Sequence, residues 1–374
     1  MASETEKVVT EALGGGKKKK AKAPEPKYLN TGVTLLNLEL TGTIDKGIAE
    51  GTVVLLAGLS SSGKTWLGEQ ILAEASIDPR FDGYVLENDD PEHGSMLLDK
   101  ERFFGPKLFK RLVTRHSPTV EDYYYNLDDR IKSGQPFISL LDSMDALDAK
   151  KDQEHFQKLK AASRKAKKDK DDEKGSYKTH KQRTNSANLR TVCVEIPKTG
   201  SIALIISQVR TNIGYGAQFN PHVVTGGIAL EFYPHYRFRL SGRDIKVVGV
   251  NKKKVIIGTQ VTLKIEKNRS SGRKSVITFP LYNDTGIDDV GACVDYLIDQ
   301  GHWEATGKKQ PDGTIDVAKA VIHATEFEAE LKRDELIPWL EETEQVDELR
   351  GIVKTVWETA REAVRVERKP RYGQ

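Results

Sequence analysis

Eight residues between positions 58 and 65 have the types and spacing of a phosphate-binding loop. Gly58 and Gly63 flank four variable positions, and Lys64 and Thr65 follow, which fits the pattern G-x-x-x-x-G-K-[ST] at every fixed position. In such a loop the glycines let successive N–H groups point at an anion, the lysine reaches the β- and γ-phosphates, and the hydroxyl holds Mg²⁺. The sequence therefore predicts a site for a nucleoside triphosphate with Mg²⁺. The expected contacts are Gly58, Leu59, Ser60, Ser61, Ser62, Gly63, Lys64, Thr65 and Trp66.

This loop is flanked by the elements that its chemistry requires. The four apolar residues Val53–Leu56 indicate a buried strand in front of it. Behind it, the apolar residues between Trp66 and Leu72 recur at helical spacing. The helix should begin near Lys64 and direct the positive end of its dipole at the phosphates. A chance glycine-rich turn would not lie between a strand and a helix in this way.

Two further predicted strands end in polar side chains that suit the same chemistry. The apolar run 136–142 ends at Asp142, where a phosphate-loop protein places the carboxylate on the Mg²⁺ side. We therefore expect Thr65 and Asp142 to hold the metal. The run 202–208 ends at Gln208, whose amide can bond either a phosphate oxygen or a water molecule. The alternative for Gln208 is a structural role at the end of a strand.

Predicted strands alternate with predicted helices along the first part of the chain. A short strand at 83–86 leads into an acidic cluster, a helix is expected over 121–133, and later strands are expected at 261–265 and 276–281. This alternation predicts an α/β fold with a twisted, mostly parallel sheet flanked by helices. Ligands of such sheets bind at the carboxyl ends of the strands.

Composition narrows the class of protein. A length of 374 residues is enough for two or three domains with a sizeable core. The chain is 37% hydrophobic and 30% charged. No apolar run approaches the roughly 20 residues of a membrane span, so no membrane partner is expected. Cys193 and Cys293 provide neither a disulfide framework nor a four-ligand zinc set. With no apolar signal segment at the N-terminus, a cytoplasmic location is the default.

The charge distribution is more informative than the net charge of +3. Basic residues gather at 17–22 and again over 158–183. Such runs are usually solvated arms, but two of them beside a nucleotide site favour a nucleic-acid partner. The segment 210–227 is rich in Gly, Asn and Pro and follows a predicted active-site strand, which indicates a functional loop.

Changes in composition divide the chain into three parts. Residues 1–27 are expected to form a short, flexible basic arm, 28–285 the nucleotide-binding core, and 286–374 a small C-terminal α/β domain. In the last part a helix is expected over 290–300, a hairpin turn at Asp312-Gly313, and helix over 326–366 with an interruption at Pro338.

From about Tyr28 to Trp303 the order of these segments resembles the RecA recombinase family. Five strings carry the resemblance: Gly58–Thr65, Leu140–Leu147, Ile206–Arg210, Thr225–Tyr233 and Lys264–Arg269. The phosphate loop alone is shared by many nucleotide hydrolases, whereas five strings in this order are far more specific. Three strings are also similar to phage recombinases of the UvsX type: Leu38–Gly42, Lys267–Arg269 and Gly286–Asp288.

This resemblance implies a RecA-like core that hydrolyses ATP with Mg²⁺ in a DNA-dependent manner. It implies a self-associating helical filament on single-stranded DNA that pairs with homologous duplex DNA and exchanges strands in recombination and repair. It further implies a phage origin in a host cytoplasm, with a single-strand-binding protein and a loader as additional candidate partners. The alternatives are a hexameric helicase built on the same core, and an ATP-binding recombination mediator without strand exchange.

The resemblance also assigns roles to residues. Gln208 would sense the γ-phosphate, and Lys267 and Arg269 would reach ATP bound to the neighbouring subunit, as arginine fingers do. An exposed basic pair at a strand end is the alternative for Lys267 and Arg269. Residues 210–227 match the family's second DNA-binding loop, and about 155–185 match the region of its first. The implied DNA contacts are Arg210, Tyr215, Phe219, Thr225, Gly226 and Gly227, although Tyr215 and Phe219 could instead be buried core aromatics.

Three carboxylates remain candidates for the group that orients the attacking water. The string Asp90-Pro91-Glu92-His93 resembles the family's Asp-Ala-Glu-His string and favours Glu92. Counting from the last apolar strand residue favours Asp89, and Glu87 is closest to the strand. Glu92 is the first choice, and Lys64 completes the expected catalytic set.

The chain also departs from the family pattern. Its 155–185 segment is longer and far more basic than the usual first loop, and its N-terminal arm is shorter and rich in lysine. The end of the chain, residues 365–371, is basic where bacterial relatives have an acidic tail.

Overall fold

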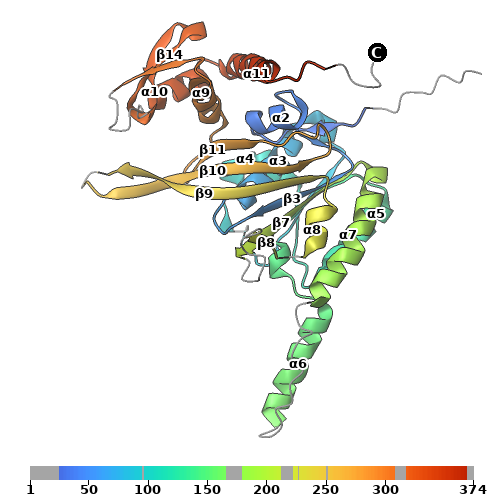
Figure 1. Ribbon diagram of the computed structural model, residues 1–374. Helices are drawn as coiled ribbons and strands as arrows, with labels where there is room; N and C mark the ends of the chain where they lie inside the picture. Colours follow the sequence, from blue (N-terminus) through green and yellow to red (C-terminus); the bar gives the residue numbers. More distant parts are fainter. Residues whose placement is uncertain are drawn as a thin grey trace, which may run out of the picture.

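A large mixed sheet organises the molecule (Figure 1). The computed structural model describes residues 25–94, 97–165, 179–211, 222–225, 227–249, 252–307 and 317–368. In these residues ten strands form one sheet in the order β12-β11-β10-β9-β3-β7-β6-β4-β5, with β8 pairing to β7. The strands are β3 (Thr52–Gly58), β4 (Val85–Asp89), β5 (Leu112–Arg115), β6 (Phe137–Leu141), β7 (Ile202–Thr211), β8 (His222–Val224), β9 (Tyr236–Val248), β10 (Lys254–Asn268), β11 (Val276–Tyr282) and β12 (Gly286–Ile287).

The middle of this sheet is parallel, which confirms the predicted fold class. Strand β3 runs parallel to both of its neighbours, β7 and β9, and β6, β4 and β5 continue the parallel part. From β9 to β12 the pairing is antiparallel. Because parallel strands need crossover connections, helices must cover both faces of this part of the sheet.

Two hydrophobic clusters cover the two faces. Alternate residues of a strand point to opposite faces, so Val54 and Leu56 pack with helix α3 (Lys64–Ile77) on one side. Val53 and Leu55 pack on the other side, with helices α5 (Val120–Ser133) and α7 (Thr179–Thr199). The run of fully buried residues in β3 therefore reflects burial on both faces.

One further helix of the core was predicted and one was not. Helix α5 matches the expected 121–133, because Thr119 caps its first turn and Gly134 ends it in the left-handed conformation at φ 73°. Helix α4 (Lys100–Arg111) and strand β5 were not expected. Gly105, at φ 82°, and Pro106 interrupt α4 and hide its helical pattern in the sequence.

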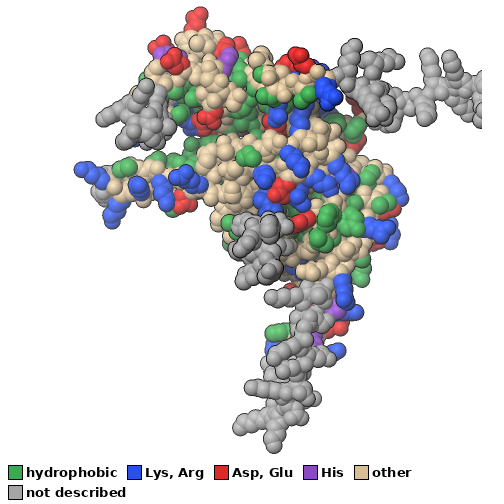
Figure 2. Space-filling view, in the orientation of Figure 1, with side chains coloured by type: hydrophobic (Ala, Val, Ile, Leu, Met, Phe, Trp, Pro, Cys, Tyr) green, Lys and Arg blue, Asp and Glu red, His purple; other side chains and the backbone are tan. Residues whose placement is uncertain are grey.

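Helix α6 (Lys150–Lys165) extends away from the sheet, toward the bottom of Figure 1. It and the following α7 account for the described parts of the basic stretch 158–183 as helix, and residues 166–178 lie outside the described part. Toward the left of Figure 1, the β9–β10 hairpin projects past the sheet, and Figure 2 shows Lys and Arg side chains along it.

The C-terminal part begins with helix α9 (Asp289–Asp299), close to the expected 290–300. It continues with a three-stranded sheet, β13 (Glu304–Thr306), β14 (Val321–Ala324) and β15 (Ala329–Lys332), and ends with α10 (Arg333–Glu342) and α11 (Val346–Ala363). The expectation of helix over all of 326–366 was wrong at β15, where pairing with β14 overrides local propensity. Pro338 lies within α10, and the Asp312-Gly313 turn lies outside the described residues.

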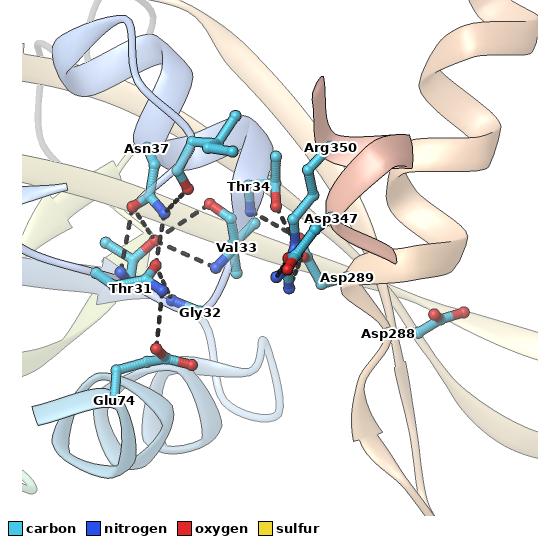
Figure 3. A network of polar contacts seen from close by, with 12 residues as sticks. Thr31, Gly32, Val33, Thr34, Asn37, Glu74, Asp288, Asp289, Asp347 and Arg350 are labelled. Atoms are coloured by element: carbon cyan, nitrogen blue, oxygen red, sulfur yellow. Dashed lines mark hydrogen bonds and ion pairs between the residues drawn. The ribbon is translucent and has the colours of Figure 1, made fainter. Parts of the chain in front are cut away.

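This C-terminal part packs on helix α2 (Thr34–Thr41), which follows the small β1 (Tyr28–Leu29) and β2 (Ile48–Ala49) pair. Figure 3 shows Asp289 pointing at Thr34 and Arg350. Its carboxylate accepts hydrogen bonds from the Thr34 N–H at 2.6 Å and the Thr34 hydroxyl at 2.8 Å, and Arg350 Nη2 lies 3.0 Å away. The apolar cluster on the α3 face continues into this part through Trp303 and Trp357.

None of the helices that the structure describes combines the length and apolarity needed to cross a membrane. The short helix α8 (Ile228–Phe232), between β8 and β9, completes the core.

Candidate nucleotide site and nucleic-acid loops

The predicted phosphate loop connects the carboxyl end of β3 to the start of α3. Gly63 precedes the helix in the left-handed conformation, at φ 87°, which a glycine adopts without strain. A Cβ at Gly58 would lie 2.3 Å from the carbonyl oxygen of Leu240 on β9, so only glycine fits there. The loop therefore has the tight backbone path and the helix N-terminus that bind a phosphate.

Lys64 is buried and folds back over the loop. Its ammonium donates to the carbonyl oxygens of Gly58 at 3.2 Å and Leu59 at 2.6 Å. Burial lowers the pKa of Lys64, and the nearby charges of Asp142 and Asp145 act in the opposite direction. The cation is therefore held among loop carbonyls at the place where a triphosphate would provide anionic partners.

Thr65 and Asp142, the two predicted metal ligands, lie side by side. The Thr65 hydroxyl donates to Asp142 Oδ2 at 2.6 Å, which joins the first turn of α3 to the tip of β6. Burial raises the pKa of the Asp142 carboxyl, and the hydrogen bond from Thr65 lowers it. Mg²⁺ usually binds through one or two protein oxygens, phosphate oxygens and water, so this pair fits the ion.

Two of the three candidate carboxylates face away from the loop. Asn88 on β4 bonds Glu69 of α3 at 2.7 Å, so its neighbours in the strand, Glu87 and Asp89, point to the opposite face. Glu87 is buried and pairs with the guanidinium groups of Arg115 and Arg130. Asp89 accepts two hydrogen bonds from a single residue, Ser117, through its N–H at 2.8 Å and its hydroxyl at 2.5 Å.

Glu92 lies on the exposed turn after β4, on the same side as Asp142. Its negative charge, together with that of Asp90, helps to raise the pKa of Asp142. His116 stabilises this turn, because its ring stacks on His93 with 3.9 Å between centroids. The Nδ1 atom of His116 also lies 2.7 Å from the carbonyl oxygen of Asp90. Sequence reasoning missed His116, for which the sequence offers no signal.

Gln208 on β7 lies beside the phosphate loop. It is the direct partner of Gly58 in the register of β3 and β7. Its carbonyl oxygen accepts from the N–H of Thr225 at 3.1 Å and from the Thr225 hydroxyl at 2.8 Å. These bonds bring together the two ends of the second predicted loop. Arg210 is exposed at the end of β7, Gly227 precedes α8, and Tyr215, Phe219 and Gly226 lie outside the described residues.

Lys267 and Arg269 lie level with the start of β3, whereas the phosphate loop follows the end of that strand. Asn268 pairs with Tyr236 on β9, and Tyr236 pairs with Val54, near the start of β3. The Lys267 ammonium donates to the carbonyl of Phe232 at 2.5 Å. Burial lowers the pKa of Lys267, and the nearby charges of Arg269 and Arg237 lower it further.

A phosphate loop at the carboxyl end of a central parallel strand, with an Asp at the tip of the second strand away, defines a P-loop ATPase fold with a RecA-like core. Comparison with known proteins agrees with this class. The family model described as the RecA N-terminal domain matches residues 156–288. The chain therefore has distant sequence homology to bacterial RecA proteins.

Three relatives illustrate this distance. Protein RecA of Teredinibacter turnerae is 29% identical over 268 residues, covering 70% of this chain and 68% of the relative. Protein RecA of Sinorhizobium medicae is 28% identical over 267 residues, covering 70% and 65%. Protein RecA of Rickettsia canadensis is 28% identical over 270 residues, covering 69% of each. The similarity thus spans about two thirds of these relatives.

Proposed function

We propose that this chain is an ATP-dependent DNA recombinase that assembles into a filament on single-stranded DNA and exchanges strands with homologous duplex DNA. The observation that carries the proposal is the distance between the predicted phosphate loop and the two cations that are predicted to act on its nucleotide. The phosphate loop lies at the carboxyl end of the parallel strands, and Lys267 and Arg269 lie at their amino end. A single subunit cannot bring them together, whereas a head-to-tail row of subunits does so at every interface.

The surface beside these cations is suited to such an interface. Three apolar side chains are exposed there, Val194 at 58%, Ile228 at 69% and Phe232 at 64%. Helices α7 and α8 that carry them are in contact, and Lys267 bonds the carbonyl of Phe232. An apolar patch beside positive charge is typical of a surface that a partner covers.

Within such an interface, each residue of the site has a definite task. Bound MgATP supplies the phosphoryl group that is transferred to water. The loop N–H groups and Lys64 would bind the phosphates, and Thr65 and Asp142 would hold the metal. Glu92 is the proposed base, because it alone of the three carboxylates lies on an exposed turn near Asp142. The neighbour's Lys267 and Arg269 would stabilise charge in the transition state.

Gln208 supports a link from nucleotide to DNA. It lies next to Gly58 and holds Thr225 at the end of the second loop. Arg210, Thr225 and Gly227, with Tyr215, Phe219 and Gly226, are the proposed DNA contacts of this loop. Phosphate contacts and stacking tolerate any sequence, as strand exchange requires, because base pairing selects the partner. We further propose the UvsX-like phage type and the division into an arm, a core to residue 285 and a C-terminal domain.

Electron microscopy of the chain with single-stranded DNA and a non-hydrolysable ATP analogue tests this proposal. We expect helical filaments. We also expect that a plot of log affinity for single-stranded DNA against log salt concentration has a slope of about −0.7 for each phosphate neutralised. Closed rings that unwind a forked duplex would instead identify a helicase. Filaments without DNA-stimulated phosphate release would identify a mediator that uses ATP as a structural ligand. DNA binding that ignores both salt and nucleotide would contradict the proposal.

A further inference from the structure

Asp145 lies where the nucleotide site meets both proposed DNA loops. It belongs to the short 3-10 turn Met144–Ala146, directly after the metal-binding position Asp142. Its Oδ2 atom accepts a hydrogen bond from the backbone N–H of Gln208 at 2.5 Å and one from the Ser207 hydroxyl at 3.1 Å. This carboxylate therefore positions the main chain of the residue proposed to sense the γ-phosphate.

The second carboxylate oxygen of Asp145, Oδ1, has a different environment. Oδ1 is buried and has no hydrogen-bond partner in the part of the chain that the structure describes. Burial lowers the pKa of the Lys64 ammonium, and the nearby charges of Asp142 and Asp145 partly offset that effect. When phosphates draw the Lys64 ammonium away from the carbonyls of Gly58 and Leu59, the electrostatic field at Asp145 must change.

The same turn also contacts the start of α7 through Lys181. This lysine lies in the first turns of α7, just after the segment that links α6 to α7. Its half-buried ammonium donates to the carbonyl oxygens of Asp145 at 3.2 Å and Leu147 at 2.5 Å. Burial lowers the pKa of Lys181, and the charges of Asp145 and Asp148 act in the opposite direction. A shift of the turn would therefore move the start of α7.

The second DNA loop reaches the turn through Gln208. Asp145 fixes the Gln208 N–H, and the Gln208 carbonyl oxygen binds the N–H and hydroxyl of Thr225. The peptide units on both sides of Gln208 are therefore held, one by the turn and one by the loop. Asp145 thus contacts elements that lead to Lys64, to α7 and to Thr225.

We propose that Asp145 is a positioning residue that couples the nucleotide site to both DNA-binding loops, to the second loop through Gln208 and to the first through Lys181. This inference rests on the proposed function, and it adds the first loop and a specific carboxylate to the link through Gln208. Its measure is the linkage factor, the ratio of single-stranded DNA affinities with and without a non-hydrolysable ATP analogue.

The test compares this factor in wild type, Asp145→Asn, Lys181→Met and the double variant. Asp145→Asn keeps the shape of the side chain and an acceptor for the Gln208 N–H but removes the charge. Lys181→Met removes the ammonium and keeps the length. We expect each variant to bind the analogue alone within about threefold of wild type and to lose about tenfold of the linkage factor. The double variant should lose little more than either single variant, because both act in one network.

Asp128→Asn is the matched control. Asp128 lies on the surface of α5 and pairs with Lys132 at 2.5 Å, so its linkage factor should equal that of wild type. If Asp145→Asn does not fold, Ser207→Ala removes one hydrogen bond to Oδ2, and Lys181→Met measures the coupling from α7. If Asp145 had a purely structural role, its variant would lower the DNA affinity equally with and without the analogue, and the linkage factor would stay unchanged.

The outcomes separate the two proposals. A wild-type linkage factor near one would overturn the proposed function and this inference with it. A large wild-type factor that persists in Asp145→Asn and Lys181→Met would overturn the inference alone. A large wild-type factor that both variants lose, while Asp128→Asn keeps it, would support both.

Discussion

The strongest test of the proposed interface is to place the two halves of the site on different chains. Lys64→Ala disables the phosphate loop, and Arg269→Ala removes a cation from the other edge. Arg269 follows Asn268, which is aligned through Tyr236 with Val54, and Gly58 lies four residues further along β3. At about 3.3 Å per residue, this part of the strand alone separates the two edges by about 13 Å. An interaction within one chain is therefore excluded by the geometry.

Each variant alone should lose about a thousandfold in DNA-stimulated ATP turnover, the lower end of what an arginine finger contributes. In an equimolar mixture that assembles at random, about a quarter of the interfaces pair an intact loop with an intact arginine. Steady-state phosphate release with single-stranded DNA should therefore recover to about a quarter of the wild-type rate.

The controls make the result decisive. A mixture of Lys64→Ala with the double variant Lys64→Ala/Arg269→Ala contains no intact loop and should stay inactive. Filament formation by each mixture, seen by electron microscopy, ensures that the chains assemble together. A mixture of the two single variants that assembles but is no faster than either variant alone would refute the reasoning.

Three further predictions concern single residues. Glu92→Gln should lower kcat for ATP by about a hundredfold with little change in KM, which a turnover assay measures. Glu87→Gln should instead lower the free energy of unfolding by about 2 kcal/mol, because Arg115 and Arg130 lose their charged partner, and denaturant titration measures that loss. Gly58→Ala should abolish binding of a fluorescent ATP analogue, since its Cβ would lie 2.3 Å from the Leu240 carbonyl oxygen. His235 Nδ1 accepts from the Val53 N–H at 3.1 Å, and burial, with the charges of Arg269 and Lys267, lowers its pKa from 6.5 to about 4. The unfolded chain takes up this proton first, so stability should fall as pH drops from about 6.5 to about 4, by up to about 3 kcal/mol; a pH series of melting curves in which His235→Asn is as pH-sensitive as wild type would contradict this.

Local patterns were sufficient for the phosphate loop and its flanks. The pattern from Gly58 to Thr65 needs only neighbouring residues, because the loop, the strand before it and the helix after it are continuous in the chain. The pairing of Thr65 with Asp142 could also be predicted, since parallel strands bring their carboxyl ends to one edge. The fold class followed from the same alternation of strands and helices.

Sequence reasoning favoured Glu92 only by resemblance, and the structure adds a geometric reason for that choice. Spacing along the chain places Glu87 and Asp89 nearer to the strand than Glu92. The side chains of a strand alternate between faces, and the bonds from Arg115 and Ser117 show that the first two lie on the far side from α3. Strand β15 illustrates the same limit, because its partner β14 and not its own composition makes it a strand.

The sequence alone thus determined the class of the fold and predicted the chemistry proposed for the nucleotide site, because both depend on short-range patterns. Only the tertiary structure decided that Lys267 and Arg269 lie at the edge away from the loop, and that Asp145 joins Gln208 to Lys181. Those relations depend on strand order and on contacts between residues far apart in the chain, and the local pattern of a strand does not say which other strand it pairs with.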